Sequence, residues 1–242
     1  MIAALFNFSQ FSTSDLITYL IGMLALLLAL SAHECAHAWV ANALGDSTGK
    51  EAGRVTLNPL AHLDPVGGLL ILIGAPVAWA KPVPFNPNRF NRKYTVRKGI
   101  ALVSIAGITA NLLMSIAAYL VYAIFYVITV AAQPASGSLV SSILSIVRLF
   151  FATLYTRNIY LAIFNLLPVP PLDGYKFFGL LMPDKIYYKI MQYERYIGMA
   201  FIVLIIFGSS YLSQLLSLIA TPLEWIIRTP IDALAKAVLS LL

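Results

Sequence analysis

Charged residues are scarce in this chain of 242 residues, because Asp, Glu, Lys and Arg together make up only 11% of it. Hydrophobic residues make up 60%, and the mean hydropathy is +0.84. Soluble globular domains are about one quarter charged, so this composition excludes a soluble globular protein. It indicates an all-α polytopic membrane protein, a single membrane domain over 1–242 with room for about five to six transmembrane helices.

Cysteine is nearly absent as well. Cys35 is the single one, which excludes an internal disulfide.

The first fourteen residues contain no Lys or Arg, so a signal peptide with a basic n-region is not expected. The net charge of +6 lies in loops between apolar runs, where basic residues act as topology signals. We therefore expect the lipid bilayer as a partner and no nucleic acid.

Histidine is also rare, yet two of the three histidines lie in one short pattern, Ser31-Ala-His33-Glu34-Cys-Ala-His37. In a helix, residues four apart share a face, so His33 and His37 can offer two imidazoles to one metal ion. Glu34 is one residue round the helix, close enough to act as a base on a water at the metal. This spacing is typical of zinc sites that take a third ligand from elsewhere in the chain.

The alternative is that these histidines simply pack in a core. Here they end a long apolar run, where two imidazoles and a carboxylate are costly unless they are paired or coordinated. We therefore favour a metal site.

Asp173 is the predicted third ligand. Prolines 168, 170 and 171 end the preceding apolar helix, so the carboxylate follows irregular backbone in an apolar context. Its rivals, Asp46 and Asp64, lie in a polar loop. His62 lies in that loop too; it is either a further ligand or an ordinary hydrogen-bonded loop histidine.

Several apolar segments are long enough to cross a membrane. We expect helices over 15–44, 99–132, 139–167 and 196–220, and an amphipathic helix over 221–242 with Glu224, Arg228, Asp232 and Lys236 at four-residue spacing; the last two segments are the C-terminal helices, 196–242. The apolar segment 66–80 is too short to span, which favours a re-entrant or partly extended hairpin over a short packing helix.

The segment 81–98 carries six basic residues and no acidic one, so it is predicted to be cytoplasmic. The first helix then enters from outside, with the N-terminus outside, and ends inside. The helix before Asp173 also descends to the inside. We therefore expect all three ligands at the cytoplasmic face of the cell membrane.

Small and polar residues recur at helical spacing on the 99–132 helix: Ser104, Gly107, Asn111 and Ser115. Small residues let neighbouring helices approach closely. The amide of Asn111 either binds a substrate backbone or a neighbouring helix, since both would satisfy it in an apolar environment.

These motifs resemble the site-2 protease family of intramembrane zinc metalloproteases, peptidase family M50. The resemblance covers about residues 31–174, the core motifs, and includes His33-Glu34-Cys-Ala-His37, Asn58-Pro-Leu-Ala-His62-Leu-Asp-Pro, Trp79-Ala-Lys-Pro-Val-Pro, Gly107-Ile-Thr-Ala-Asn111 and the run from Asn165 to Gly174. Ile108 departs from the family, in which many relatives have proline there.

The resemblance implies one zinc ion per chain, held by His33, His37 and Asp173, with Glu34 activating water. It places Asn111 and Asn165 near a substrate strand. It further implies cleavage of transmembrane protein substrates within or near their membrane segments, by a compact member without a PDZ or CBS domain.

Two other functions fit parts of the pattern. A catalytically inert zinc scaffold or a transporter would use a closed site with four protein ligands, whereas three convincing ones are present beside a carboxylate that only catalysis requires. A protease acting on soluble peptides would not need both the His33–His37 pattern and the run before Asp173 to lie in apolar segments.

Overall fold

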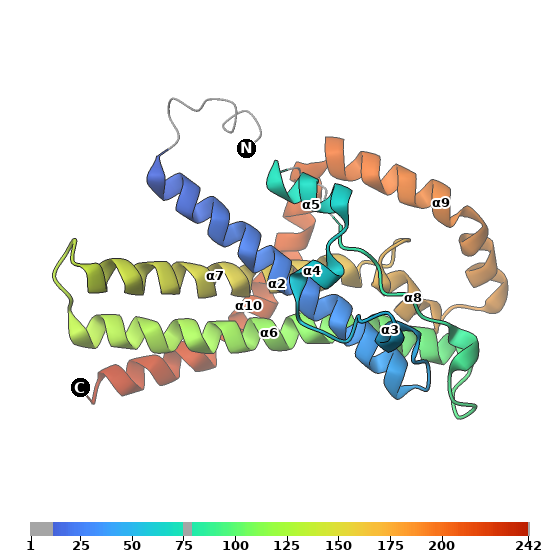
Figure 1. Cartoon of the computed structure of the whole chain (residues 1–242), viewed down its shortest axis with the longest axis horizontal. Helices are drawn as coiled ribbons and strands as arrows, with labels where there is room; N and C mark the ends of the chain where they lie inside the picture. Colours follow the sequence, from blue (N-terminus) through green and yellow to red (C-terminus); the bar gives the residue numbers. More distant parts are fainter. Residues whose placement is uncertain (1–11, 75–78, 242) are drawn as a thin grey trace.

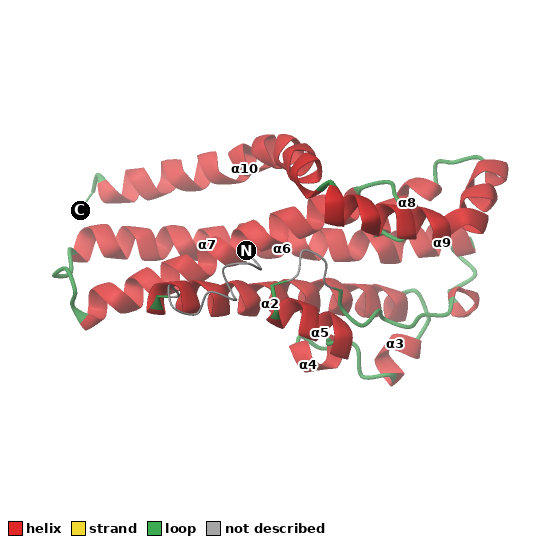
Figure 2. Ribbon diagram, turned by 90° about the horizontal axis from the view of Figure 1, so that it is seen from above, coloured by secondary structure: helices red, strands yellow, loops and turns green. Residues whose placement is uncertain are grey.

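The computed structural model describes residues 12–74 and 79–241, which are almost entirely helical. Three long helices form the centre: α2 (Thr13–Ala43), α6 (Val96–Ala132) and α7 (Leu139–Leu166). The helices α6 and α7 run side by side as a hairpin, and α2 crosses both (Figures 1 and 2). This arrangement brings the C-terminal third of α2 beside the first half of α6.

Side-chain caps explain where these helices begin. Ser12 and Asp15 form a capping box at the start of α2. Thr95 caps α6 and Ser138 caps α7, each accepting a hydrogen bond from the backbone N–H three residues on. At the end of α6, Gln133 has φ 41°, and this left-handed residue turns the chain back into the hairpin.

Short elements cover one side of α2: α3 (Thr48–Glu51), α4 (Pro59–His62), α5 (Pro65–Leu72) and the 3-10 turn η2 (Pro87–Arg89). The predicted hairpin over 66–80 is thus partly helical, because α5 takes up its first half. Leu63 and Ala80 pair as an isolated antiparallel bridge, so the chain returns in extended form. Residues 75–78 lie outside the described part of the chain.

The C-terminal region differs from the predicted boundaries. After α8 (Asp173–Gly179), α9 runs over Asp184–Phe207 and α10 over Ser209–Leu239. The expected span 196–220 is therefore divided at Gly208, where a Cβ would lie 2.8 Å from the carbonyl oxygen of Leu204. In α9 the charged first part, 184–195, and the apolar part that follows it form one helix, because no helix-breaking residue separates them.

Four helices in the described residues are long and apolar enough to cross a membrane: α2, α6, α7 and α9. This confirms an all-α, multi-pass membrane protein. The expected five to six spans exceed these four because α5 has only eight residues and α10 carries the charged stripe.

Two apolar clusters hold the bundle together. The larger joins α2, α6, α7 and α10 around residues such as Ile159 and Ala220, which are 0% and 1% exposed. The smaller joins the end of α2 to the start of α6 through Ala41, Phe90 and Val103. Between them, the polar stripe of α6 is buried against α2 and α7.

Candidate metal centre

His33 and His37 lie one turn apart on α2 and are both buried, at 4% and 8% exposed. Their rings meet edge to face, with centroids 4.5 Å apart. Gly107 of α6 faces them, and a Cβ there would lie 2.6 Å from the Cε1 atom of each ring. The close approach of α2 and α6 at this glycine is what lets both rings turn toward the same point.

Asp173 comes to that point from the opposite side. It is the first residue of α8 and is 8% exposed. Its Oδ2 lies 2.9 Å from His33 Nε2 and 3.0 Å from His37 Nε2. The three donor atoms lie within 4.8 Å of one another, and theirs is the one such cluster in residues 12–74 and 79–241.

The other ring nitrogens determine how the imidazoles are protonated. His33 Nδ1 lies 2.7 Å from Asn111 Oδ1, and His37 Nδ1 lies 2.7 Å from the carbonyl oxygen of Val103. Both partners are acceptors, so each Nδ1 must carry the proton and donate. A ring that carries its one proton on Nδ1 presents the lone pair of Nε2 to Asp173, which is the form that a metal ligand requires.

Two ring nitrogens and a carboxylate oxygen at about 3 Å separation need either shared protons or a cation between them. Two imidazoles and one carboxylate form a common catalytic zinc donor set, and Nδ1–H groups bonded to acceptors are its usual supporting contacts. The residues present therefore fit a zinc ion.

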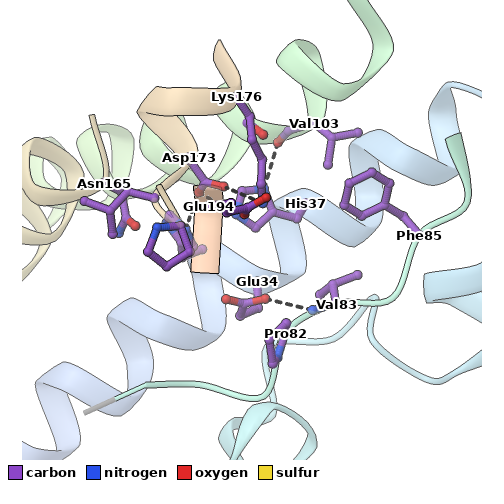
Figure 3. A pocket seen from close by; sticks show the side chains of 14 residues that line it. Glu34, His37, Pro82, Val83, Phe85, Val103, Asn165, Asp173, Lys176 and Glu194 are labelled. Carbon is purple, nitrogen blue, oxygen red and sulfur yellow. Dashed lines mark hydrogen bonds and ion pairs between the residues drawn. The ribbon is translucent and has the colours of Figure 1, made fainter. Parts of the chain in front are cut away.

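Glu34 lies beside this cluster and does not belong to it. Its Oε2 accepts a hydrogen bond from the backbone N–H of Val83, at 3.1 Å (Figure 3). Val83 belongs to an extended stretch, residues 80–86, that we call the covering segment. This segment runs past the face of α2 that bears Glu34.

A cavity of about 320 Å³ opens at the cluster. Its polar lining comes from α2, α6, α7, α8 and α9, and the covering segment adds apolar side chains. Its lining residues are His33, Glu34, His37, Pro82, Val83, Phe85, Val103, Ser104, Asn165, Pro171, Leu172, Asp173, Lys176 and Glu194.

The structure separates the two asparagines. Asn165 lines the cavity, and its amide donates to the carbonyl of Leu161 at 3.0 Å. Asn111 is 0% exposed and is not in the cavity lining. Beside its contact to His33, its amide donates to the Ala29 carbonyl at 3.0 Å and to Asn158 Oδ1 at 2.8 Å.

The other candidate residues have contacts of their own. His62 is 2% exposed, with Nε2 2.8 Å from the carbonyl oxygen of Thr56. Asp64 caps α5 by accepting from two backbone N–H groups. Asp46 is 0% exposed and accepts from the backbone N–H of Asn86 and from Thr48. Their structural contacts place all three outside the cluster.

Four residues around the site escaped sequence reasoning. Lys176 has its Nζ 3.9 Å from Asp173 Oδ1 and follows it by three residues, a helical spacing that could have found it. Asn158, a polar residue in an apolar helix, was also open to detection. Val83 acts through its backbone, so its place in the Trp79–Pro84 motif did not reveal its contact with Glu34, and Glu194 comes from another helix.

Comparison with known proteins places the chain in a family. The model of “Peptidase family M50” matches residues 21–205. A Bacillus subtilis (strain 168) protein, “Putative zinc metalloprotease YwhC”, is 36% identical over 192 residues, which cover 79% of this chain and 82% of that protein. No solved structure matches the chain. With the family model spanning both motif halves, the chain belongs to peptidase family M50, the site-2 protease family, and is a zinc metalloprotease.

Proposed function

We propose that this protein hydrolyses peptide bonds within or near the transmembrane segments of membrane protein substrates. The observation that carries the proposal is the meeting of three donor atoms beside Glu34, in a cavity formed by helices that are apolar enough to span a membrane. A peptide that reaches this cavity arrives between membrane helices.

We assign His33, His37 and Asp173 as the ligands of one zinc ion per chain. When bound, zinc supplies a Lewis acid there, which lowers the pKa of a water to about 7 and polarises the scissile carbonyl. The residues around the ligands keep them in place before substrate arrives. Asn111 and the Val103 carbonyl hold the two rings in one tautomer.

Glu34 is assigned as the general base and acid. It takes a proton from the water that attacks the carbonyl carbon, and it passes that proton to the amine as the C–N bond breaks. Because Val83 engages Oε2, we assign Oε1 to these transfers. The contact with Val83 also restrains the carboxylate, which limits its conformational freedom.

Asn165 is the proposed substrate-binding asparagine, because it lines the cavity. Asn111 was predicted to contact substrate, but its contacts support a different role. Its side-chain amide already hydrogen-bonds to groups within the protein, so we assign it to orienting His33. A substrate helix has to unwind to expose its amide, and the extended covering segment supplies backbone that an extended peptide could lie against.

We further propose that the site faces the cytoplasm. The basic segment 81–98 contains residues 81–86 of the covering segment and the first residues of α6, so it lies on the same side of the molecule as the donor cluster. Basic loops remain on the cytoplasmic side of a membrane. Water and products would then exchange with the cytoplasm.

The test uses the purified chain in lipid vesicles with a transmembrane peptide substrate that has helix-breaking residues. Glu34→Gln should keep its zinc and lower cleavage by about 10²–10⁴-fold, the usual worth of general acid–base catalysis. Glu51→Gln, an exposed carboxylate paired with Arg89, is the matched control and should cleave normally.

Cleavage by Glu34→Gln at the wild-type rate would contradict the assignment of the base. Zinc without cleavage in the wild type would favour an inert scaffold. Cleavage of soluble casein but not of the membrane substrate would favour a protease of soluble peptides.

A further inference from the structure

The helix that carries Asp173 is too short to hold its own position. α8 has seven residues, and isolated helices of that length are not stable in water. Its direction has to be set by contacts with the rest of the protein. A small rotation of α8 would carry Oδ2 of Asp173 away from His33 and His37, so whatever fixes α8 also fixes the cluster.

Arg97 of α6 makes such contacts at the far end of α8. Its guanidinium donates to the carbonyl oxygen of Gly179, the last residue of α8, and to that of Met182. It also forms an ion pair with Asp184 at the start of α9. The orphan carbonyls of a helix C-terminus favour a cation, and the rigid fork of arginine can engage several acceptors at once.

Two aromatic rings complete the arrangement. The guanidinium lies 4.5 Å from the ring centroid of Tyr187 on α9. Tyr187 stacks on Tyr175 of α8, with centroids 5.8 Å apart. The Tyr187 ring can pack here because residue 179 is glycine: a Cβ at Gly179 would lie 2.7 Å from that ring. Arg97 is therefore bound to α8 at its last carbonyl and through the ring pair.

The same helix α6 that bears Arg97 also holds the histidines. Val103 and Asn111 bond the two Nδ1 atoms, and Gly107 packs against both rings. Arg97 and Gly107 are ten residues apart, about 15 Å along one rigid helix. One helix thus fixes the histidine side of the site directly and the Asp173 side through Arg97.

From these contacts we propose that Arg97 is a positioning residue, which sets Asp173 in register with His33 and His37 by clamping the C-terminal end of α8. The inference rests on the proposed ligand set. It distinguishes Arg97 from the other basic residues of the 81–98 segment, whose predicted role is topology.

The test measures metal binding without measuring cleavage. Co²⁺ is titrated into the metal-free protein in detergent micelles, its visible absorption recorded, and Zn²⁺ affinity obtained by competition. The variants are Arg97→Gln, Arg97→Lys and the matched control Lys98→Gln, which removes an adjacent exposed positive charge. Helical content and elution volume of each variant show that it has folded.

Arg97→Gln should weaken metal binding on the order of 10-fold or more and change the Co²⁺ spectrum, as loss of supporting contacts at metal sites does. Arg97→Lys keeps the charge but not the fork, so it should fall between Arg97→Gln and wild type. Lys98→Gln should match wild type. If Arg97→Gln does not fold, Arg97→Lys carries the comparison.

Wild-type affinity and spectrum in Arg97→Lys and Arg97→Gln would overturn the inference, and so would an equal loss in Lys98→Gln. These results would leave the proposed function standing. Failure of the wild type itself to bind either metal would contradict the ligand set, and with it both proposals.

Discussion

Gly107 shows how closely the site is packed at the scale of single residues. The rings of His33 and His37 occupy the space that a side chain at Gly107 would need. The ligand pair therefore depends on a residue that contributes no donor atom. In the sequence, Gly107 is a small member of a helical stripe and the first residue of the Gly107–Asn111 motif, and neither pattern predicts its contact with both rings.

We predict that Gly107→Ala disrupts metal binding, because its Cβ would be 2.6 Å from the Cε1 atoms of both rings. At least one ring must move. Loss of a single supporting contact already weakens metal binding by about 10-fold or more, so Zn²⁺ affinity should fall by more than 10-fold here. Competition with a chelator measures it. Gly22→Ala on α2, where the nearest atom lies at 3.7 Å, should bind zinc normally; a Gly107→Ala protein with unchanged affinity would disprove the packing argument.

Asn111 gives a second prediction at this scale. In Asn111→Leu, His33 Nδ1 loses its acceptor within the membrane protein, so the ring loses its fixed tautomer. Zinc affinity should fall by about 10–100-fold. Asn158→Leu removes a contact one step further away and should have a smaller effect. Equal affinities in wild type and Asn111→Leu would contradict the orienting role.

The predictions for the four main candidate residues come from local sequence patterns. His33, Glu34 and His37 share one helical turn, and Asp173 follows a run of prolines. The contact of Val83 with Glu34 and the place of Glu194 in the cavity lining could not be predicted, because both depend on how distant segments come together. The amide of Asn111 was open to two roles, and only its three partners distinguish them.

At the scale of elements, the covering segment is held at the end nearest α6 by Asp46. Its carboxylate accepts a hydrogen bond from the backbone N–H of Asn86. Burial acts to raise the pKa of Asp46, but the hydrogen bonds from Thr48 and Asn86 outweigh it, so the pKa lies below its ordinary value of 3.8. Asp46 is therefore ionised, and its contact with the covering segment intact, at neutral pH.

We predict that Asp46→Asn lowers thermal stability at pH 7, by weakening the bonds to Thr48 and Asn86. Since folding depresses this pKa, the stabilisation is present above the unfolded value of 3.8 and is lost as pH falls through the lower folded value. The difference in melting temperature between wild type and Asp46→Asn should thus be constant from pH 7 to about 5. It should shrink toward zero under more acidic conditions. A difference that grows as pH falls would contradict the assignment.

Element boundaries were predicted well where a cap or a breaker marks them. The first helix was expected over 15–44 and spans Thr13–Ala43. The C-terminal boundaries were missed because hydropathy changes near Arg195 while the helix continues from Asp184 to Phe207. The break falls at Gly208, a single glycine inside an apolar run and the C-cap of α9, so the hydropathy pattern did not mark it.

At the scale of the whole molecule, the donor cluster lies toward the end of the α6–α7 hairpin that is opposite its turn. His33 and His37 belong to the C-terminal third of α2, Val103 is in the first quarter of α6, and Asp173 follows the end of α7. The turn over 133–138 is at the far end of the α6–α7 hairpin. If the site faces the cytoplasm, that turn faces the other side of the membrane.

We predict this orientation can be read from cysteine labelling, because Cys35 is the single cysteine of the chain. In a Cys35→Ala background, Ser136→Cys in the turn should react with a membrane-impermeant maleimide in intact cells. Lys93→Cys, in the basic segment, should react only after the cells are opened. The reverse pattern would contradict a cytoplasmic site.

The most direct test of the central claim is the zinc content of the purified protein, measured by mass spectrometry in wild type and Asp173→Ala. The account predicts about one zinc per chain in the wild type and little in the variant, because the site loses its single carboxylate ligand. Glu51→Ala, an exposed carboxylate outside the site, should retain the wild-type content. A wild type without zinc, or an Asp173→Ala protein with its full content, would contradict the ligand set on which the proposed protease mechanism depends.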